Sequence, residues 1–77
     1  MENAQSDGRA DIVAKHPAGV WIFELKVNEP VDSAMGQIRE RGYDAPYRAL
    51  GKPIWAIGLS FNRDSRRLVG HAVARLA

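Results

Sequence analysis

Two strand-like segments, residues 10–15 and 20–27, follow one another near the start of the chain and limit the folds that it can adopt. The second segment is rich in β-branched and aromatic residues, which favour β-strands. The sequence His-Pro-Ala-Gly at 16–19 lies between them. It predicts a four-residue hairpin loop, because proline presets φ and glycine can adopt a positive φ. We therefore expect an antiparallel β-hairpin at the start of the fold.

A helix is expected after this hairpin. Apolar residues recur every three or four positions between residues 34 and 45, which is the spacing of a helix that packs one face against a sheet. Asp32 or Ser33 is placed to cap its start. Pro46 should end or kink the helix near Asp44, because proline disrupts a helix interior.

Two more strands complete the expected sheet. Residues 53–61 are almost all apolar, and such a run is typical of a central strand buried on both faces. Residues 66–76 fit a strand or a helix, and we favour a strand because the short polar turn at 62–65 invites an antiparallel return. The helix allows a right-handed crossover between parallel neighbours. The expected fold class is α/β (α+β), with a small mixed sheet and the helix on one face.

The composition fits one small globular domain. Of 77 residues, 45% are hydrophobic and 26% are charged, and no apolar segment approaches the ~20 residues of a membrane span. Residues 1–8 form a polar N-terminal segment unlike a signal peptide, so we expect a cytoplasmic location and no membrane partner. The chain has no cysteine, which excludes disulfides and zinc-thiolate sites. A core this small favours a homodimer.

The hairpin register brings three charged residues together. If Lys15 pairs with Val20 across the loop, Asp11 lies opposite Glu24. Opposed residues on antiparallel strands have Cβ atoms about 4.5–5.5 Å apart, so the two carboxylates would share one face. Lys26 points to the same side, because side chains alternate along a strand.

This charge cluster indicates a specific chemistry. Two neighbouring carboxylates repel each other unless they share a proton or a cation. Oxygen ligands favour Mg²⁺ or Mn²⁺, and a cation at Asp11 and Glu24 could hold a phosphate oxygen and activate water. Lys26 could stabilise the negative charge that develops at phosphorus, so the pattern indicates phosphodiester hydrolysis. A surface cluster of ion pairs is the alternative, although Val20 and Ile22 would share this face and argue against full exposure.

Short motifs in a fixed order extend beyond this cluster. They are Gly-Arg-x-Asp at 8–11, Phe-Glu-Leu-Lys at 23–26, Gln-Ile-Arg-Glu-Arg-Gly-Tyr at 37–43, Pro-Tyr at 46–47 and Ile-Gly-Leu-Ser-Phe at 57–61. Together they resemble the PD-(D/E)XK nuclease superfamily. Within it, the chain is most similar to the nuclease domain at the C-terminus of bacterial proteins with an AAA-ATPase-like N-terminal region. The resemblance extends from about residue 8 to residue 67.

The resemblance implies a restriction-endonuclease-like minimal core that cuts DNA with Mg²⁺ or Mn²⁺. By position, Asp11 and Glu24 match the metal-binding acids of the family, and the carbonyl of Leu25 matches a further ligand. Lys26 matches the catalytic lysine. Gln37 matches a helix glutamine that contacts the active site or the DNA in related nucleases, and a solvated helix residue is the alternative. An ATPase is an expected partner.

A second set of residues is expected to contact nucleic acid. Eight of the eleven positive residues are arginine, the side chain best suited to bidentate phosphate contact. The arginines near residue 65 form either such a patch or a solvated turn. Tyr43 lies where the family often has a tyrosine, and packing at the helix end is an equal alternative. The candidate nucleic-acid-binding residues are Arg9, Tyr43, Arg63, Arg66 and Arg67.

The sequence departs from the family at its start. Related nucleases have a helix before the first core strand that supplies a glutamate to the metal site, whereas ten residues precede Asp11 here. We therefore expect residues 9–77 to form a single truncated nuclease-like domain. Two functions remain open: a Mg²⁺-dependent deoxyribonuclease, or a catalytically inactive module that keeps the fold for nucleic-acid binding or assembly.

Overall fold

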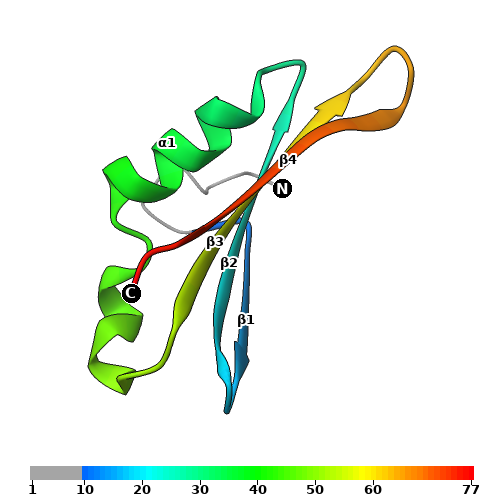
Figure 1. Ribbon diagram of the computed structural model, residues 1–77. Helices are drawn as coiled ribbons and strands as arrows, with labels where there is room; N and C mark the ends of the chain where they lie inside the picture. The colour runs from blue at the N-terminus through cyan, green and yellow to red at the C-terminus, as the bar shows by residue number, and fades with distance from the viewer. Residues whose placement is uncertain (1–9) are drawn as a thin grey trace.

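A four-stranded mixed sheet carries the helical segments on one of its faces (Figure 1). The computed structural model describes residues 10–77, so the expected polar segment 1–8 and Arg9 lie outside the described residues. In the strand order β1-β2-β3-β4, the central pair is parallel and the two outer pairs are antiparallel. This arrangement confirms the predicted fold class. The elements are β1 (Ile12–His16), β2 (Gly19–Val27), α1 (Val31–Arg41), the 3-10 helix η2 (Ala45–Leu50), β3 (Ile54–Asn62) and β4 (Arg67–Arg75).

The hairpin of β1 and β2 has the predicted register but a tighter loop. Lys15 pairs with Val20 as expected, and His16 also pairs with Gly19. Two residues therefore form the turn, instead of the predicted four. The N–H of Ala18 donates to His16 Nδ1 at 3.0 Å, which stabilises the compact turn.

The start of α1 differs slightly from the prediction. Pro30 occupies the N-cap position, so the predicted capping residues Asp32 and Ser33 lie inside the first turn. Proline preceding a helix needs no hydrogen-bond partner for its nitrogen. The Asp32 carboxylate is favourable in this turn because the N-terminal end of a helix carries partial positive charge.

The end of α1 corrects the prediction that Pro46 terminates the helix near Asp44. Gly42 ends it first, with a φ of 63° and an N–H that donates to the carbonyl of Arg39 at 3.2 Å. Glycine adopts this left-handed conformation without steric cost. Pro46 instead lies at the start of η2, which ends at Gly51 with a φ of 69°.

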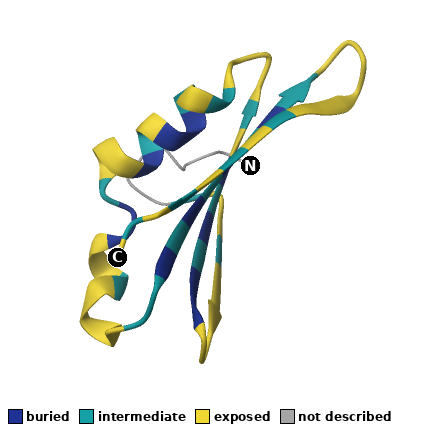
Figure 2. Cartoon of the chain, viewed as in Figure 1, coloured by how far each residue is buried: buried dark blue, intermediate teal, exposed yellow. Residues whose placement is uncertain are grey.

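The core lies between α1 and the facing side of β2 and β3, where Figure 2 shows the buried positions. Along β3, buried residues alternate with half-buried ones. Within residues 10–77, this corrects the prediction of a strand buried on both faces, because α1 covers one face and the other face is only half-buried. Gly58 permits close packing here, since a Cβ at this position would lie 2.9 Å from Met35 Sδ. The buried apolar residues are Val20, Ile22, Ala34, Met35, Ile38, Tyr43, Ile54 and Ala56.

The last segment forms a strand, as predicted. β4 pairs antiparallel with β3, with an irregularity between Ser60 and Phe61. The turn that joins them is held by Asn28, whose Oδ1 accepts a hydrogen bond from the N–H of Arg63 at 2.9 Å. Asn28 has a φ of 58°, a left-handed conformation that asparagine tolerates. No helix within residues 10–77 combines the length and apolar character needed to cross a membrane.

Candidate active site

Asp11 and Glu24 lie next to each other at the β1 edge of the sheet. The N–H of Leu25 donates to Asp11 Oδ2 at 2.8 Å, and the N–H of Asp11 lies 3.4 Å from Glu24 Oε1. These contacts continue the hairpin register beyond the pair of Ile12 and Phe23. The Asp11 residue is exposed, whereas Glu24 is buried. The structure thus places one carboxylate at the surface and the other just beneath it.

Gln37 connects this acid pair to Lys26. Its Oε1 accepts a hydrogen bond from Lys26 Nζ at 2.5 Å. Its Nε2 donates to Glu24 Oε2 at 2.7 Å and to Tyr43 Oη at 2.8 Å. Both amide hydrogens and the carbonyl oxygen are therefore used, which fixes the orientation of the amide. Gln37 holds the acid and the lysine of β2 in one cluster.

The local sequence explains why these side chains meet. Glu24 and Lys26 lie two residues apart on β2, so both point to the face that α1 covers. Gln37 follows the buried Ala34 by three residues on α1, which places it at the border of the buried stripe. The contact between helix and sheet depends on Gly58, where any side chain would meet Met35.

Burial and charge both act on Glu24. The residue is 3% exposed, and its burial raises the pKa of the carboxyl group above the ordinary value, with a further rise from the Asp11 carboxylate. The N–H of Asp11 and the positive charges of Lys26 and Arg41 act in the opposite direction. A cation bound here would relieve both the cost of burial and the repulsion between the acids.

The donor set of this site suits a hard divalent cation. Among residues 10–77, no group of three or more His, Cys, Asp or Glu side chains lies together, so the side-chain donors are the carboxylates of Asp11 and Glu24. The Leu25 N–H points towards Asp11, and the carbonyl of the same strand residue faces the same edge. Two carboxylates and a carbonyl fit Mg²⁺, which commonly binds one or two carboxylates and keeps several waters.

Three of the candidate nucleic-acid-binding residues are exposed arginines at or beside one turn. Arg63 and Arg66 are exposed in the β3–β4 turn, and Arg67 is the exposed first residue of β4. Lys26 pairs with Ser60 across the sheet, three residues before Arg63, so this turn lies at the Lys26 end of the sheet (Figure 1).

Tyr43 lies in the core instead of at the surface. The residue is 3% exposed, and its hydroxyl accepts the hydrogen bond from Gln37. This burial favours packing and support of Gln37 over contact with nucleic acid. The six-residue spacing of Gln37 and Tyr43 could have indicated a contact across the helix end, because Gly42 turns the chain back between them.

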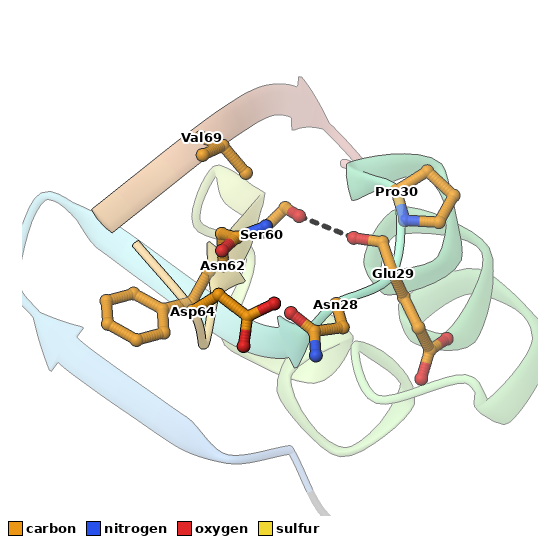
Figure 3. A pocket seen from close by; sticks show the side chains of 8 residues that line it. Asn28, Glu29, Pro30, Ser60, Asn62, Asp64 and Val69 are labelled. Atoms are coloured by element: carbon orange, nitrogen blue, oxygen red, sulfur yellow. Dashed lines mark hydrogen bonds between the residues drawn. The ribbon is translucent and has the colours of Figure 1, made fainter. Parts of the chain in front are cut away.

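A separate hollow of about 340 Å³ opens between the end of β2, the start of α1 and the β3–β4 turn (Figure 3). Asn28 and Asp64 line it, and the Ser60 hydroxyl donates to the carbonyl of Glu29 at its wall. None of the predicted site residues lines this hollow. The sequence analysis did not identify Asn28 as a residue of this hollow. An asparagine directly after a strand could have indicated a turn here, since this residue type is enriched at positive φ.

Comparisons with known proteins agree with this geometry. The family model of the PD-(D/E)XK nuclease superfamily matches residues 1–71. The "uncharacterized protein in vnfD 5′region" of Azotobacter chroococcum mcd 1 is 42% identical over 78 residues, a match that covers 99% of this chain and 15% of that protein. The chain thus spans a small part of the length of this relative. No solved structure matches the chain. On the strength of the family match and the Asp11, Glu24 and Lys26 cluster, the chain belongs to the PD-(D/E)XK nuclease superfamily.

Proposed function

We propose that this domain hydrolyses phosphodiester bonds in DNA with Mg²⁺ or Mn²⁺ as cofactor. The observation that carries the proposal is the Gln37 amide, which hydrogen-bonds to Glu24 and Lys26 beside Asp11. Membership of a nuclease superfamily supports a nucleic acid as the substrate. Divalent metals are the general cofactors of that superfamily, and the donor set at Asp11 and Glu24 fits them.

Each residue of the cluster has a proposed role. Asp11, Glu24 and the carbonyl of Leu25 would hold the cation, which supplies Lewis acidity and lowers the pKa of water. Lys26 Nζ has three hydrogens and uses one on Gln37. The others can donate to a phosphate oxygen and stabilise its growing negative charge. Gln37 keeps Nζ beside the acids.

The basic residues would position the DNA. Arg63, Arg66 and Arg67 lie at the Lys26 end of the sheet, so a strand whose phosphate reaches Lys26 could extend towards this turn. Arg9 precedes Asp11 by two residues in the sequence and is proposed as a further phosphate contact. Arginine binds phosphate through two parallel hydrogen bonds, and such contacts fix register without reading sequence.

We also propose a working context for the domain. A homodimer would compensate for a small core, and the cytoplasm would provide the DNA. An ATPase is a proposed partner because the sequence resembles nuclease domains that follow AAA-ATPase-like regions. A catalytically inactive nucleic-acid-binding or assembly module is the second candidate function. The Gln37 amide already satisfies Glu24 and Lys26 through hydrogen bonds, which is the observation that favours this second candidate.

Cleavage assays test the two candidates. Supercoiled, linear duplex and single-stranded DNA would be incubated with the protein and Mg²⁺ or Mn²⁺, beside Asp11→Ala and Lys26→Ala. Lys52→Ala and Glu40→Gln serve as matched controls, because both residues lie outside the cluster. We expect cleavage by the wild type and the controls alone, with all proteins folded by circular dichroism.

Calorimetric titration with Mn²⁺ separates metal binding from chemistry. Asp11→Ala should lose Mn²⁺ binding, whereas Lys26→Ala should keep it and still fail to cleave. Equal cleavage by all variants would contradict the proposed catalytic site. DNA binding without metal-dependent cleavage by the wild type would support the inactive module instead.

A further inference from the structure

The side of the sheet opposite α1 carries an uninterrupted apolar surface, which we call the open face. It consists of alternate residues of the two central strands, from Trp21 to Val27 on β2 and from Trp55 to Phe61 on β3. Parallel pairing sets them in rows, with Trp21 beside Trp55 and the later residues following in step. All are half-buried or exposed, and Val27 is 44% exposed. Within residues 10–77 no helix lies on this side (Figures 1 and 2).

The sequence of the two strands also indicates a second buried surface. In β3 both sets of alternate residues are mostly apolar, which is typical of strands covered on both sides. In β2 the polar residues Glu24 and Lys26 point towards α1, whereas Phe23 and Leu25 point to the open face. Polar residues are thus concentrated at the site and absent from the centre of the open face.

The outer strands border the open face with both polar and apolar side chains, and the apolar ones include the exposed Ile12 beside Phe23 and Val73 beside Ile57. Among the polar residues of this border, the Arg75 guanidinium lies 5.7 Å from the centre of the Trp55 ring. The ring centres of His16 and Trp21 lie 6.3 Å apart in an edge-on arrangement. By register, His71 on β4 lies beside Leu59. An apolar centre bordered in part by polar side chains is typical of a protein interface. The uncharged centre does not complement the phosphates of nucleic acid.

The size of the open face suits a second copy of the chain. β2, β3 and β4 each have nine residues, which corresponds to a length of about 30 Å at about 3.3 Å per residue. β1 has only five residues, so at about 4.8 Å per strand the open face and the two strands that border it have a projected area of roughly 510 Å². This is near the upper end of the apolar patches found on monomers, about 300–600 Å². Two such faces together give roughly 1,000 Å², which is about the minimum total area of a specific protein interface.

We propose that two copies of this chain pack through their open faces to form a two-sheet sandwich. A two-fold axis parallel to the strands places β2 of one protomer over β3 of its partner. Trp21 then faces the partner's Trp55, and Phe23 faces the partner's Ile57. Sheets packed in this way are about 10 Å apart, with their side chains interdigitated.

This arrangement deepens the homodimer proposed above and leaves both sites accessible. Glu24 and Lys26 lie on the face covered by α1, so the two sites open on the outer sides of the sandwich. The dimer therefore does not depend on bound metal or DNA. Its formation and the cleavage chemistry can be tested separately on the same samples.

Sedimentation velocity over a wide range of protein concentration tests this proposal. We expect the mass of a dimer for the wild type and the mass of a monomer for Phe23→Asp, because a carboxylate would be desolvated in the apolar interface. Leu50→Asp is the matched control, since Leu50 is an equally apolar exposed residue on η2, away from the open face. It should remain dimeric.

A second variant keeps the test decisive if Phe23→Asp fails to fold. Val27 is 44% exposed, so Val27→Lys should fold, by circular dichroism, and still weaken the dimer at least tenfold. A wild type that stays monomeric at every concentration would overturn the proposal. Binding of lipid vesicles or of another protein segment to its open face would then identify a different occupant. Mn²⁺ titration of the same samples reports on the metal site independently.

Discussion

The Gln37 amide joins α1 to β2 through hydrogen bonds of opposite direction. It accepts from Lys26 and donates to Glu24, so one amide satisfies both a cation and an anion. Its second amide hydrogen goes to the buried Tyr43 hydroxyl, and a flipped amide would place Oε1 against the Glu24 carboxylate and Nε2 against the Lys26 ammonium group. At the residue scale, the order of the site depends on this one amide.

Replacing Gln37 by Leu should disorder the site and destabilise the fold. The change leaves Glu24 and Tyr43 without their partner, and an unsatisfied buried polar group costs about 1–3 kcal/mol. Loss of an outer hydrogen bond to a metal ligand typically lowers metal affinity by roughly 10- to 100-fold. Denaturant unfolding and Mn²⁺ calorimetry measure the two effects.

Tyr43→Phe provides a graded comparison for this prediction. It removes only the hydroxyl, so we expect a smaller loss of about 1 kcal/mol and a smaller change in Mn²⁺ affinity. Tyr47→Phe, on the half-buried tyrosine of η2, is the control and should leave Mn²⁺ affinity unchanged. Unchanged Mn²⁺ affinity in folded Gln37→Leu would show that the amide does not position the metal ligands.

Glu24 makes the stability of the metal-free domain depend on pH. Burial and Asp11 raise the pKa of this carboxyl group, so the folded chain holds the Glu24 proton more tightly than the unfolded chain does. The contribution to the free energy of unfolding is therefore fully present at low pH. This contribution is lost as the pH rises from the ordinary pKa of a glutamate in the unfolded chain through the raised pKa of Glu24 in the folded chain.

Glu24→Gln should abolish this loss, because glutamine does not ionise and can still accept hydrogen bonds. Above the titration window, the metal-free variant should be more stable than the wild type, and added Mn²⁺ should stabilise the wild type more. Urea unfolding in EDTA at a series of pH values measures this, with Asp32→Asn as the control on α1. Parallel stability profiles for wild type and Glu24→Gln would contradict the assigned cause.

At the scale of elements, the sequence predicted those features of the fold that depend on local patterns, such as the register of the hairpin. The pairing of Lys15 with Val20 follows from a short loop, and the contact of Asp11 with Glu24 follows from that register. The helix end was missed because two breakers compete, and Gly42, which precedes Pro46, acts first. The family resemblance pointed to Gln37 as an active-site or DNA contact, but its individual hydrogen bonds could not be predicted, because they depend on how closely α1 approaches the sheet.

Gly58→Ala should test that approach. Its Cβ would lie 2.9 Å from Met35 Sδ and 3.2 Å from Ala34 Cβ, so α1 must move outward. Overpacking of this kind typically costs about 1–3 kcal/mol. The displacement should also lengthen the contact of Gln37 with Lys26 and weaken Mn²⁺ binding.

Gly36→Ala is the matched control for this prediction. Gly36 lies in the same helix, and a Cβ there meets nothing within 4 Å. Alanine is a better helix former than glycine, so this change should stabilise the domain by roughly 0.5–1 kcal/mol. Thermal unfolding should show a lower melting temperature for Gly58→Ala and a higher one for Gly36→Ala than for the wild type. Equal effects would show that packing against Gly58 does not set the helix position.

At the scale of the whole molecule, the sheet has one face in the core and one open face. The core cluster within residues 10–77 contains seven buried residues. Small domains bury a limited fraction of their surface and are correspondingly marginal in stability. Covering the open face would extend apolar burial to both sides of β2 and β3, so association and folding should be coupled.

The melting temperature should therefore rise with protein concentration. Anything that binds only the folded chain stabilises it by mass action, and a second copy is such a ligand. Scanning calorimetry of the wild type over a wide concentration range should show this rise. Phe23→Asp should melt at a lower temperature that does not change with concentration, whereas Leu50→Asp should follow the wild type. A wild-type melting temperature independent of concentration would mean that the monomer is stable with its open face in water.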